Sequence, residues 1–426
     1  MSVQIIRGNA LDLQVEDSSV DLVVTSPPYF GLRSYQDGGS HYEGQIGAEA
    51  TPAEFVDALI AATREMMRVV RPSGSIWVNL GDKYAGGGNG PQGSSGDLAP
   101  SGYGERSRQP SAAERRAAMG AARPKSLLGI PWRYAIRCID DLGLILRAEV
   151  IWSKPNGLPE SVTDRVRRSH EQWFHFTLNP RYYSAVDEVR ETILHPDVRR
   201  TSPKHEAAPF AKGQPAHTTL STTQPNPLGK LPGSVWTIAT EPLRVPEELG
   251  IDHFAAFPTE WPRRIITGWS PRGVCVECGA GRRPVSHTPP YAGNVNECAT
   301  DGQIEARGGV GSTSALRLSG GPKQKFRAAN PTVITGEACD CPEPTAPTTP
   351  GVVLDPFGGT GTTALVAHAL GRHGISVDMS ADYCRLAEWR TTDPKQQAKA
   401  ARKPYTPPAE QMPGQGDLFD LAEGTA

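Results

Sequence analysis

The residues from Thr25 to Tyr29 read Thr-Ser-Pro-Pro-Tyr and directly follow an apolar stretch, Val20–Val24. Proline fixes its own φ angle and has no N–H to donate, so two in succession end a central strand and hold the adjoining carbonyls rigid. A hydroxyl before the prolines and an aromatic ring after them then form a stiff acceptor beside a stacking surface. This pattern suits an exocyclic amino group on a planar base. The alternative is a plain turn that ends a strand.

An exocyclic amine is a poor nucleophile because its lone pair is delocalised into the ring. Acceptors at the Ser26 hydroxyl and at the carbonyl near Pro27 would bind its N–H hydrogens and turn the lone pair toward a methyl donor. Pro28 helps to fix the backbone, and Tyr29 would stack on a base that has left its duplex. Ser26 need not be a strong base, since the proton becomes acidic once the methyl group has been transferred.

A second group of residues lies near the C-terminus, where the apolar stretch Val352–Asp355 ends in an acid. Residues 356–363 read Pro-Phe-Gly-Gly-Thr-Gly-Thr-Thr, and a helix is expected over 364–370. Glycines let a ligand approach the backbone closely, and the first turn of a helix offers free N–H donors. Ile375–Val377 then reads as a strand that ends at Asp378, the place where an acid binds the hydroxyls of a ribose. A tight turn without a ligand is the alternative.

The acid before the glycine loop indicates which nucleotide derivative fits. A dinucleotide site binds a pyrophosphate, which a carboxylate at Asp355 would repel. A cation is favoured instead, such as the sulfonium and ammonium groups of S-adenosylmethionine. We therefore expect Asp355, the loop Gly358–Gly361 and Asp378 to hold that cofactor.

Four cysteines occur in two close pairs, Cys275-x-x-Cys278 and Cys339-x-Cys341. Four thiolates fit a tetrahedral structural zinc ion and leave no open position for catalysis. The alternatives are four free thiols, or Cys298 as a competing ligand. Two further cysteines, at positions 138 and 384, fall in helical patterns and read as core residues.

The remaining sequence supplies elements that would position these groups. Apolar residues at helical spacing and short apolar runs alternate along the N-terminal half, which indicates a parallel α/β sheet. Arg71–Gly74 is expected to break the chain before a strand, and Pro131 to open a helix. The expected strands are Val3–Ile6, Val20–Thr25, Ser75–Leu80 and Leu144–Trp152, and the expected helices are 52–70 and 127–138.

Composition excludes several classes of protein. The chain of 426 residues is 38% apolar and 21% charged, which is enough to form a core. Its net charge of −2 does not by itself indicate a polyanion partner. The sequence contains no run of 18 apolar residues, so no membrane-spanning helix is expected. The first residues do not show the basic-then-apolar pattern of a signal peptide. An odd number of cysteines, mostly in close pairs, favours a reducing, cytoplasmic setting.

Basic residues concentrate in the middle third, where residues 101–210 carry 18 Lys or Arg against 13 Asp or Glu. This region would suit a nucleic-acid surface, and a solvated loop surface is the alternative. The segments 105–125 and 163–204 are candidates for phosphate contacts. Their arginines include Arg165, Arg167, Arg168, Arg199 and Arg200.

Together these motifs make the sequence resemble the amino-group DNA methyltransferases of the permuted β class, whose catalytic tetrapeptide precedes the cofactor loop. The resemblance extends over most of residues 3–270 and 350–390. It implies a circularly permuted, Rossmann-like α/β sheet that binds S-adenosylmethionine, a loop-rich recognition region and the small zinc-binding insert. The implied substrate is double-stranded DNA with its target base flipped out, in a bacterial or phage-encoded enzyme.

The resemblance also assigns residues to roles. Asn9 lies in a segment similar to the one that touches the cofactor's adenine, with Asp12 as an alternative, and Lys154 and Glu171 lie in segments similar to those that support the target pocket. The implied catalytic residues are Ser26, Pro27, Pro28 and Tyr29, and the implied cofactor-binding residues are Asn9, Phe257, Pro258, Asp355, Phe357, Gly358, Gly359, Thr360, Gly361, Thr362 and Asp378.

In this family the tetrapeptide Ser-Pro-Pro-Tyr is associated with cytosine, which implies N4-methylcytosine as the product. Adenine N6 is the nearest alternative. A protein glutamine methyltransferase also uses a Pro-Pro-Tyr site, but there Asn precedes the prolines and the cofactor loop comes first. A DNA-binding protein without catalysis is the alternative from another class.

The predicted organisation follows from these assignments. The tail segment Gln415–Phe419 faintly resembles a peptide that binds the bacterial sliding clamp, and a chance Leu-Phe in a disordered tail is the alternative. Neither the recognition sequence nor the oligomeric state can be predicted. The expected divisions are 1–84 (catalytic half of the core), 85–125 (Gly/Ser-rich and basic insert), 126–195 (core continuation), 196–250 (target recognition), 251–274 (core segment before the cofactor loop), 275–341 (zinc insert), 350–390 (cofactor-binding half of the core) and 391–426 (disordered tail).

Overall fold

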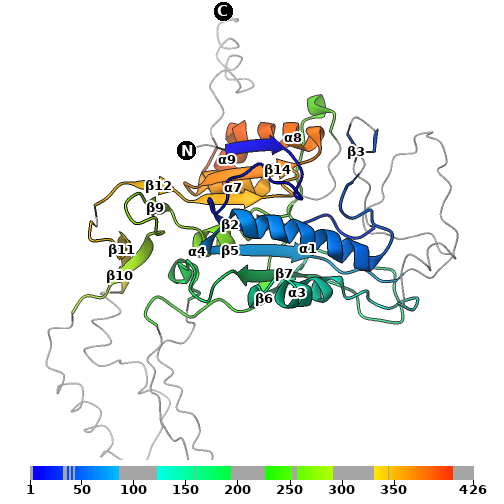
Figure 1. Cartoon of the computed structure of the whole chain (residues 1–426), viewed down its shortest axis with the longest axis horizontal. Helices are drawn as coiled ribbons and strands as arrows, with labels where there is room; N and C mark the ends of the chain where they lie inside the picture. Colours follow the sequence, from blue (N-terminus) through cyan, green and yellow to red (C-terminus); the bar gives the residue numbers. More distant parts are fainter. Residues whose placement is uncertain are drawn as a thin grey trace, which may run out of the picture.

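The computed structural model of the chain (Figure 1) has one central sheet with helices on both faces. It describes residues 3–31, 36–37, 40–41, 44–85, 122–157, 159–192, 226–251, 257–290, 331–343 and 345–405. Most of the predicted insert 85–125, the segments 193–225 and 291–330, and the tail segment Gln415–Phe419 lie outside the described residues. So do Cys298, Arg199 and Arg200.

The main sheet is mixed, and its strands come from both ends of the chain. Its strand order is β1-β14-β13-β2-β5-β7-β6-β8. The strands from β1 to β5 pair in parallel, whereas β7 pairs antiparallel with both β5 and β6. The bounds are β1 (Val3–Arg7), β2 (Val20–Thr25), β5 (Val70–Leu80), β6 (Ile145–Ser153), β7 (His170–Thr177), β8 (Val235–Thr237), β13 (Val352–Asp355) and β14 (His373–Asp378).

Two apolar cores cover the two faces of this sheet. Helices α1 (Pro52–Val69) and α3 (Ile130–Asp140) pack on one face, and α4 (Glu260–Trp269) and α7 (Thr362–Ala369) pack on the other. Strand β2 serves both cores because its side chains alternate: Val23 points to the α1 side, and Leu22 and Val24 point to the α4 side. The expected parallel α/β arrangement is therefore confirmed for the half of the sheet that contains β2 and β13.

Local sequence explains where the longest helix begins. Thr51 caps α1 by accepting a hydrogen bond from the Glu54 N–H at 3.2 Å, and the Glu54 carboxylate accepts one from the Thr51 N–H at 3.0 Å. Pro52 occupies the first turn, where its missing N–H has no cost. This capping box satisfies the N–H groups of Thr51 and Glu54 and sets the residue at which the helix begins.

Two expectations about the strands are corrected. Arg71–Gly74 does not precede the strand but lies within β5, because the segment forms a bulge: Val20 pairs with Val70, and Leu22 with Ser75. Strand β7 was not predicted, since its aromatic residues are buried on both faces and show no alternation of polar and apolar types.

The prediction that residues 391–426 form a disordered tail is wrong for residues 391–400. Helix α8 (Ala381–Thr392) crosses residue 391, and α9 (Pro394–Ala400) follows it. Asp393 caps α9, and Ala400 is fully buried in the α4-side core. The polar composition of α9 predicted disorder, but the helix is stabilised by packing of Ala400 against the core.

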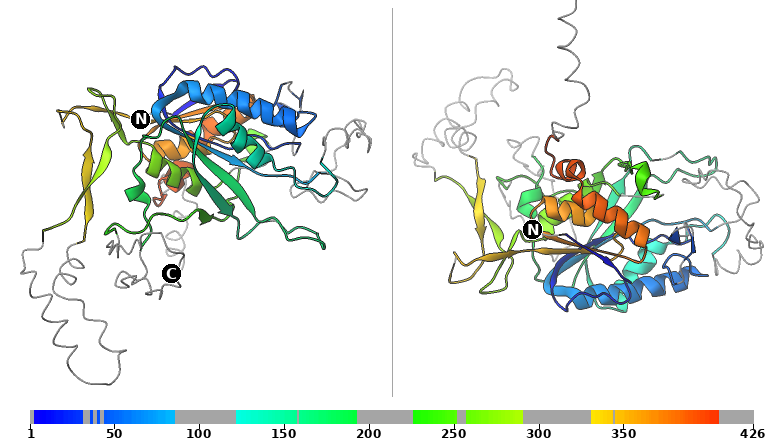
Figure 2. Two further views of the ribbon diagram at one scale, coloured as in Figure 1. Left: turned by 60° about the horizontal axis from the view of Figure 1, so that its bottom comes forward. Right: turned by 90° about the horizontal axis from the view of Figure 1, so that it is seen from above.

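The remaining described elements lie at the margins of the sheet. In Figures 1 and 2 the pairs β9–β12 and β10–β11 extend from one end of the molecule, away from β3 (Gln36–Asp37) and β4 (Ser40–His41). In the described part of the chain, every helix is too short or too polar to span a lipid bilayer. The further bounds are β9 (Gly273–Cys275), β10 (Arg283–His287), β11 (Val333–Ala338), β12 (Thr348–Pro350), η1 (Val186–Val189) and η2 (Glu247–Leu249).

Burial predicts different costs for the same substitution at two tryptophans. Trp77, in the middle of β5, is 1% exposed, and Trp132 on α3 is 42% exposed. We expect Trp77→Ala to lower the free energy of unfolding by about 3–5 kcal/mol through lost apolar burial and a cavity. Trp132→Ala serves as the control and should cost no more than about 1 kcal/mol in urea denaturation. Equal losses at the two positions would contradict the described packing.

Candidate active site

The predicted catalytic and cofactor segments meet because their strands are neighbours. Strand β13 pairs in parallel with β2, with Val353 opposite Leu22 and Leu354 opposite Val23. Parallel strands end at the same edge of a sheet, so the tetrapeptide after β2 and the glycine loop after β13 emerge side by side. That edge is where ligands bind in open α/β sheets.

A pocket lies at this edge and is lined by both segments. Ser26 and Pro28 contribute from the tetrapeptide, and Phe357, Gly359 and Thr360 from the glycine loop. Asn9 and Asp378, which were also predicted to touch the cofactor, complete the lining on the β1 and β14 side. Three further lining residues, Gly8, Ala10 and Pro356, belong to the segments that were expected to touch the cofactor. The others, which no motif indicated, are Gln45, Ile46, Met379 and Tyr383.

Asp355 does not line this pocket. Its carboxylate is 1% exposed and accepts hydrogen bonds from the Thr25 hydroxyl at 2.6 Å, the Thr363 hydroxyl at 2.8 Å and the Phe357 N–H at 3.1 Å. The expectation of a direct cofactor contact is therefore corrected to an internal position. Burial is the main cause that raises the pKa of Asp355 to about 6, against these hydrogen bonds, and the charge of Asp378 adds to the rise.

Asp378 and the loop are joined directly. The Gly359 N–H donates to one Asp378 carboxylate oxygen at 2.8 Å, and the Ser380 N–H donates to the other at 2.8 Å. Glycine is required at Gly358, because a Cβ there would lie 1.8 Å from the Ser376 hydroxyl oxygen. The loop thus passes tightly over β14 and presents its backbone to the pocket.

A buried arginine of α8 binds two threonine hydroxyls of the same loop. Arg390 of α8 is 3% exposed, and its Nη1 lies 2.7 Å from the Thr360 hydroxyl and 2.6 Å from the Thr362 hydroxyl. Burial lowers the pKa of Arg390 to about 10, so the side chain stays charged at neutral pH. Thr362 therefore binds Arg390 behind the pocket and does not line it. Arg390 was not predicted as a site residue because it is the last residue of the predicted core segment 350–390 and belongs to no motif.

A polar network holds the tetrapeptide. Ser26 donates to Asn79 Oδ1 at 3.3 Å, and the Tyr29 hydroxyl lies 2.8 Å from both Asn79 Oδ1 and Glu171 Oε2. Lys154 pairs with the other carboxylate oxygen of Glu171. Asn79 is 1% exposed and was not predicted, since its only signal is a polar residue inside an apolar strand.

The remaining predicted cofactor residues lie elsewhere. Phe257 packs edge-on against Trp173 with ring centroids 6.0 Å apart. Neither Phe257 nor its neighbour Pro258 lines the pocket. Gly361 is the N-cap of α7 with a φ of +71°, so it shapes the turn behind the lining residues.

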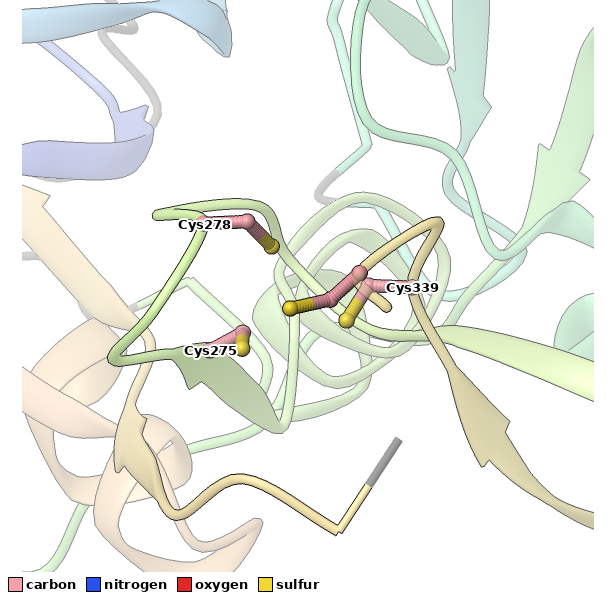
Figure 3. A group of neighbouring side chains, drawn as sticks. Cys275, Cys278 and Cys339 are labelled. Carbon is pink, nitrogen blue, oxygen red and sulfur yellow. The ribbon is translucent and has the colours of Figure 1, made fainter. Parts of the chain in front are cut away.

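The four predicted metal ligands converge. The sulfur atoms of Cys275, Cys278, Cys339 and Cys341 all lie within 4.8 Å of one another. Figure 3 shows the labelled sulfurs directed into one shared space between the β9 end and the β11 end. Backbone N–H groups of Cys278 and Glu277 lower the pKa of the Cys275 thiol, which favours its thiolate. The cluster closes the base of the β10–β11 ribbon, next to the β9–β12 pair that leads into β13.

Comparison with known proteins supports what the geometry indicates. The family profile N6_N4_Mtase, described as DNA methylase, matches residues 20–276 and 346–389. The chain belongs to this family of DNA methylases. It is accordingly an S-adenosylmethionine-dependent DNA methyltransferase that acts on an amino group.

Several methyltransferases are similar to this DNA methylase. The type II methyltransferase M.SmaI of Serratia marcescens is 27% identical over 391 residues, which cover 91% of this chain and 90% of that protein. The type II methyltransferase M.Cfr9I of Citrobacter freundii is 32% identical over 262 residues, 61% of this chain and 70% of that protein. The solved PvuII DNA methyltransferase, described as cytosine-N4-specific, aligns over 94% of this chain and 92% of its own with a TM-score of 0.49 and 17% identity.

The internal position of Asp355 generates a prediction for the methylase. An asparagine at 355 can donate to the Thr363 oxygen, whose own hydrogen is then free for the Val24 carbonyl, 3.2 Å away. Because the folded-state pKa is raised, ionised Asp355 destabilises the fold above about pH 6 and not below pH 4. Asp355→Asn should therefore be at least as stable as wild type at pH 7.5, by up to about 3 kcal/mol, and this advantage should shrink toward pH 4.5.

Urea denaturation of both proteins at the two pH values measures this difference. Asp140→Asn is the matched control, since that carboxylate is exposed at the end of α3, and its stability should match wild type at both pH values. A large loss of stability in Asp355→Asn at pH 7.5 would show that the ionised carboxylate is needed for folding.

Proposed function

We propose that this methylase transfers a methyl group from S-adenosylmethionine to the N4 amino group of a cytosine that has been flipped out of duplex DNA. One observation carries the proposal: Ser26 lines the same pocket as Phe357, Gly359 and Asp378. The residues suited to hold an amino group and those suited to hold a nucleoside therefore share one cavity.

The lining fits S-adenosylmethionine. Asp378 offers a carboxylate for the ribose hydroxyls, while Ile46, Phe357 and Met379 offer apolar surface for the adenine. Asp355 would act at a distance, through a negative charge beneath the loop that favours a cationic cofactor. When bound, the cofactor supplies an electrophilic methyl group.

The Ser26 hydroxyl is oriented for accepting a hydrogen bond. Because its hydrogen is directed to Asn79 Oδ1, its lone pairs remain for an N–H of the substrate amine. Asn79 is itself fixed through its amide N–H, which donates to the Gln172 carbonyl at 3.0 Å. Ser26 would keep its hydrogen bond to the amine while methyl transfer forms the N–C bond and returns the S–C electron pair to sulfur as a neutral thioether. The amine proton, made acidic by the transfer, would then pass to solvent. Preorganised acceptors of this kind lower the barrier mainly by orientation.

We also propose that the order of segments is a circular permutation of the methyltransferase sheet. The catalytic tetrapeptide precedes the cofactor loop by more than three hundred residues, yet β2 and β13 are adjacent. The preference for cytosine over adenine rests on serine at position 26, as in the resemblance described above.

The direct test is nucleoside mass spectrometry of unmethylated DNA incubated with the protein and S-adenosylmethionine. N4-methylcytosine is the expected product. N6-methyladenine would overturn the choice of base while keeping the pocket and the chemistry. Absence of any modified nucleoside on DNA of varied sequence would overturn the proposed function.

Two substitutions test the tetrapeptide. Ser26→Ala should lower turnover by roughly ten- to a hundredfold, because one preorganised acceptor is lost, and Tyr29→Ala should lower it further. The Michaelis constant for S-adenosylmethionine should stay close to the wild-type value in both variants. Ser19→Ala, whose hydroxyl donates to the Glu16 carbonyl away from the pocket, is the control for serine. Wild-type rates in Ser26→Ala and Tyr29→Ala would refute the site.

We further propose that Cys275, Cys278, Cys339 and Cys341 hold a structural zinc ion. Their mutual sulfur distances suit a tetrahedral site, and the tight turn after Cys275 is typical of a zinc knuckle. The ion would tie the β10–β11 ribbon to the strand pair that precedes β13.

Metal analysis tests this proposal. Purified wild-type protein should contain about one zinc per chain, and Cys278→Ser should contain little and melt at a lower temperature. Cys384→Ser, outside the cluster, should keep its zinc. Wild-type protein that lacks zinc after purification in zinc-supplemented medium would rule out the site.

A further inference from the structure

The loop between β6 and β7, described at residues 154–157 and 159–169, begins and ends next to the residues that support the tetrapeptide. Its base is closed by a hydrogen bond from the Lys154 N–H to the Ser169 carbonyl at 2.8 Å and by the Lys154–Glu171 ion pair. Glu171 is also the partner of the Tyr29 hydroxyl at 2.8 Å. In Figure 2 the β6–β7 hairpin extends past the rest of the sheet.

The loop is held in shape by its own charged side chains. The Arg165 guanidinium lies 2.7 Å from the Glu160 carboxylate and stacks 3.8 Å above the Tyr84 ring. Arg167 donates to the Gly157 carbonyl at 3.1 Å. Lys125 pairs with Asp164 at 2.6 Å, which neutralises the loop's second acid. These contacts give a preformed loop with a basic surface.

Val166 belongs to this loop and faces solvent. It is 85% exposed, more than any other large apolar side chain in the described residues. Single exposed apolar residues are ordinary on protein surfaces. This one differs because it is flanked by Arg165, Arg167 and Arg168 on a loop that is braced from within.

Val166 lies close in the chain to Glu171, the partner of Tyr29. Glu171 follows it by five positions, so their Cα atoms lie within about 17 Å of each other even if the chain is fully extended. A base that reaches the pocket beside Ser26 leaves a gap in the duplex stack. A rigid apolar side chain on a positively charged loop suits the edge of such a gap.

We propose that Val166 is a wedge that enters the base stack of duplex DNA while Arg167, the exposed arginine next to it, holds an adjacent phosphate. This inference rests on the proposed function, since it requires a flipped base. Insertion of Val166 would offset the free-energy cost of unstacking that flipping requires, and this cost is smaller for a mismatched base than for a paired one.

The test compares Val166→Ala with wild type on two DNA substrates. The modified site is first mapped on unmethylated plasmid DNA with wild-type enzyme. Synthetic duplexes then carry this site either fully paired or with a mismatch opposite the target base, and single-turnover rates are measured at saturating S-adenosylmethionine. Val285→Ala is the matched control, because Val285 is an exposed valine on the distant β10–β11 ribbon.

Val166→Ala should methylate the paired duplex about tenfold more slowly than wild type, but the mismatched duplex at close to the wild-type rate. Val285→Ala should match wild type on both. Equal rates for Val166→Ala and wild type on the paired duplex, or the same slowing on both duplexes, would overturn the wedge. Failure of wild type to methylate any DNA would instead overturn the proposed function on which the wedge depends.

Discussion

The hydrogen bond between the Thr25 hydroxyl and the Asp355 carboxylate joins residues that are 330 positions apart, and the active site depends on it. It fixes the end of β2 against the end of β13, so that the tetrapeptide and the glycine loop leave the sheet at one edge. Asp355 is buried and its carboxylate is held by the Thr25 and Thr363 hydroxyls and the Phe357 N–H. One side chain therefore ties the end of β2 to the glycine loop after β13.

Two buried charges support the glycine loop, and both use threonine hydroxyls as partners. Asp355 accepts from Thr363, and Arg390 donates to Thr360 and Thr362. Burial raises the pKa of Asp355 and lowers the pKa of Arg390, so in both cases it favours the neutral form. Keeping each group charged therefore lowers the free energy of unfolding. This arrangement explains why the loop carries threonines among its glycines. The glycines allow close approach of a ligand, and the threonine hydroxyls tie the backbone down.

Much of the fold could be predicted from the sequence because apolar periodicity is local. Strand β2, helix α1 and the β13–loop–α7–β14 unit follow from runs of apolar residues and their flanking prolines and glycines. The misses have tertiary causes: β7 is buried on both faces, and α9 is held by packing of Ala400. Asn9, Thr360 and Asp378 line the pocket as the sequence predicts. Met379 and Tyr383 also line it, but they belong to no motif. Asp355 is buried instead, where its carboxylate accepts a hydrogen bond from Thr25.

The central claim is that one pocket, formed by segments from the two ends of the chain, holds the cofactor with its reactive sulfur toward the tetrapeptide. A crystal structure of the protein with S-adenosylhomocysteine tests it most directly. The account predicts the ribose within hydrogen-bond distance of the Asp378 carboxylate, the adenine against Phe357, and the sulfur facing Ser26 and Pro28. A ligand bound away from Asp378, or with its sulfur directed away from Ser26, would contradict the account.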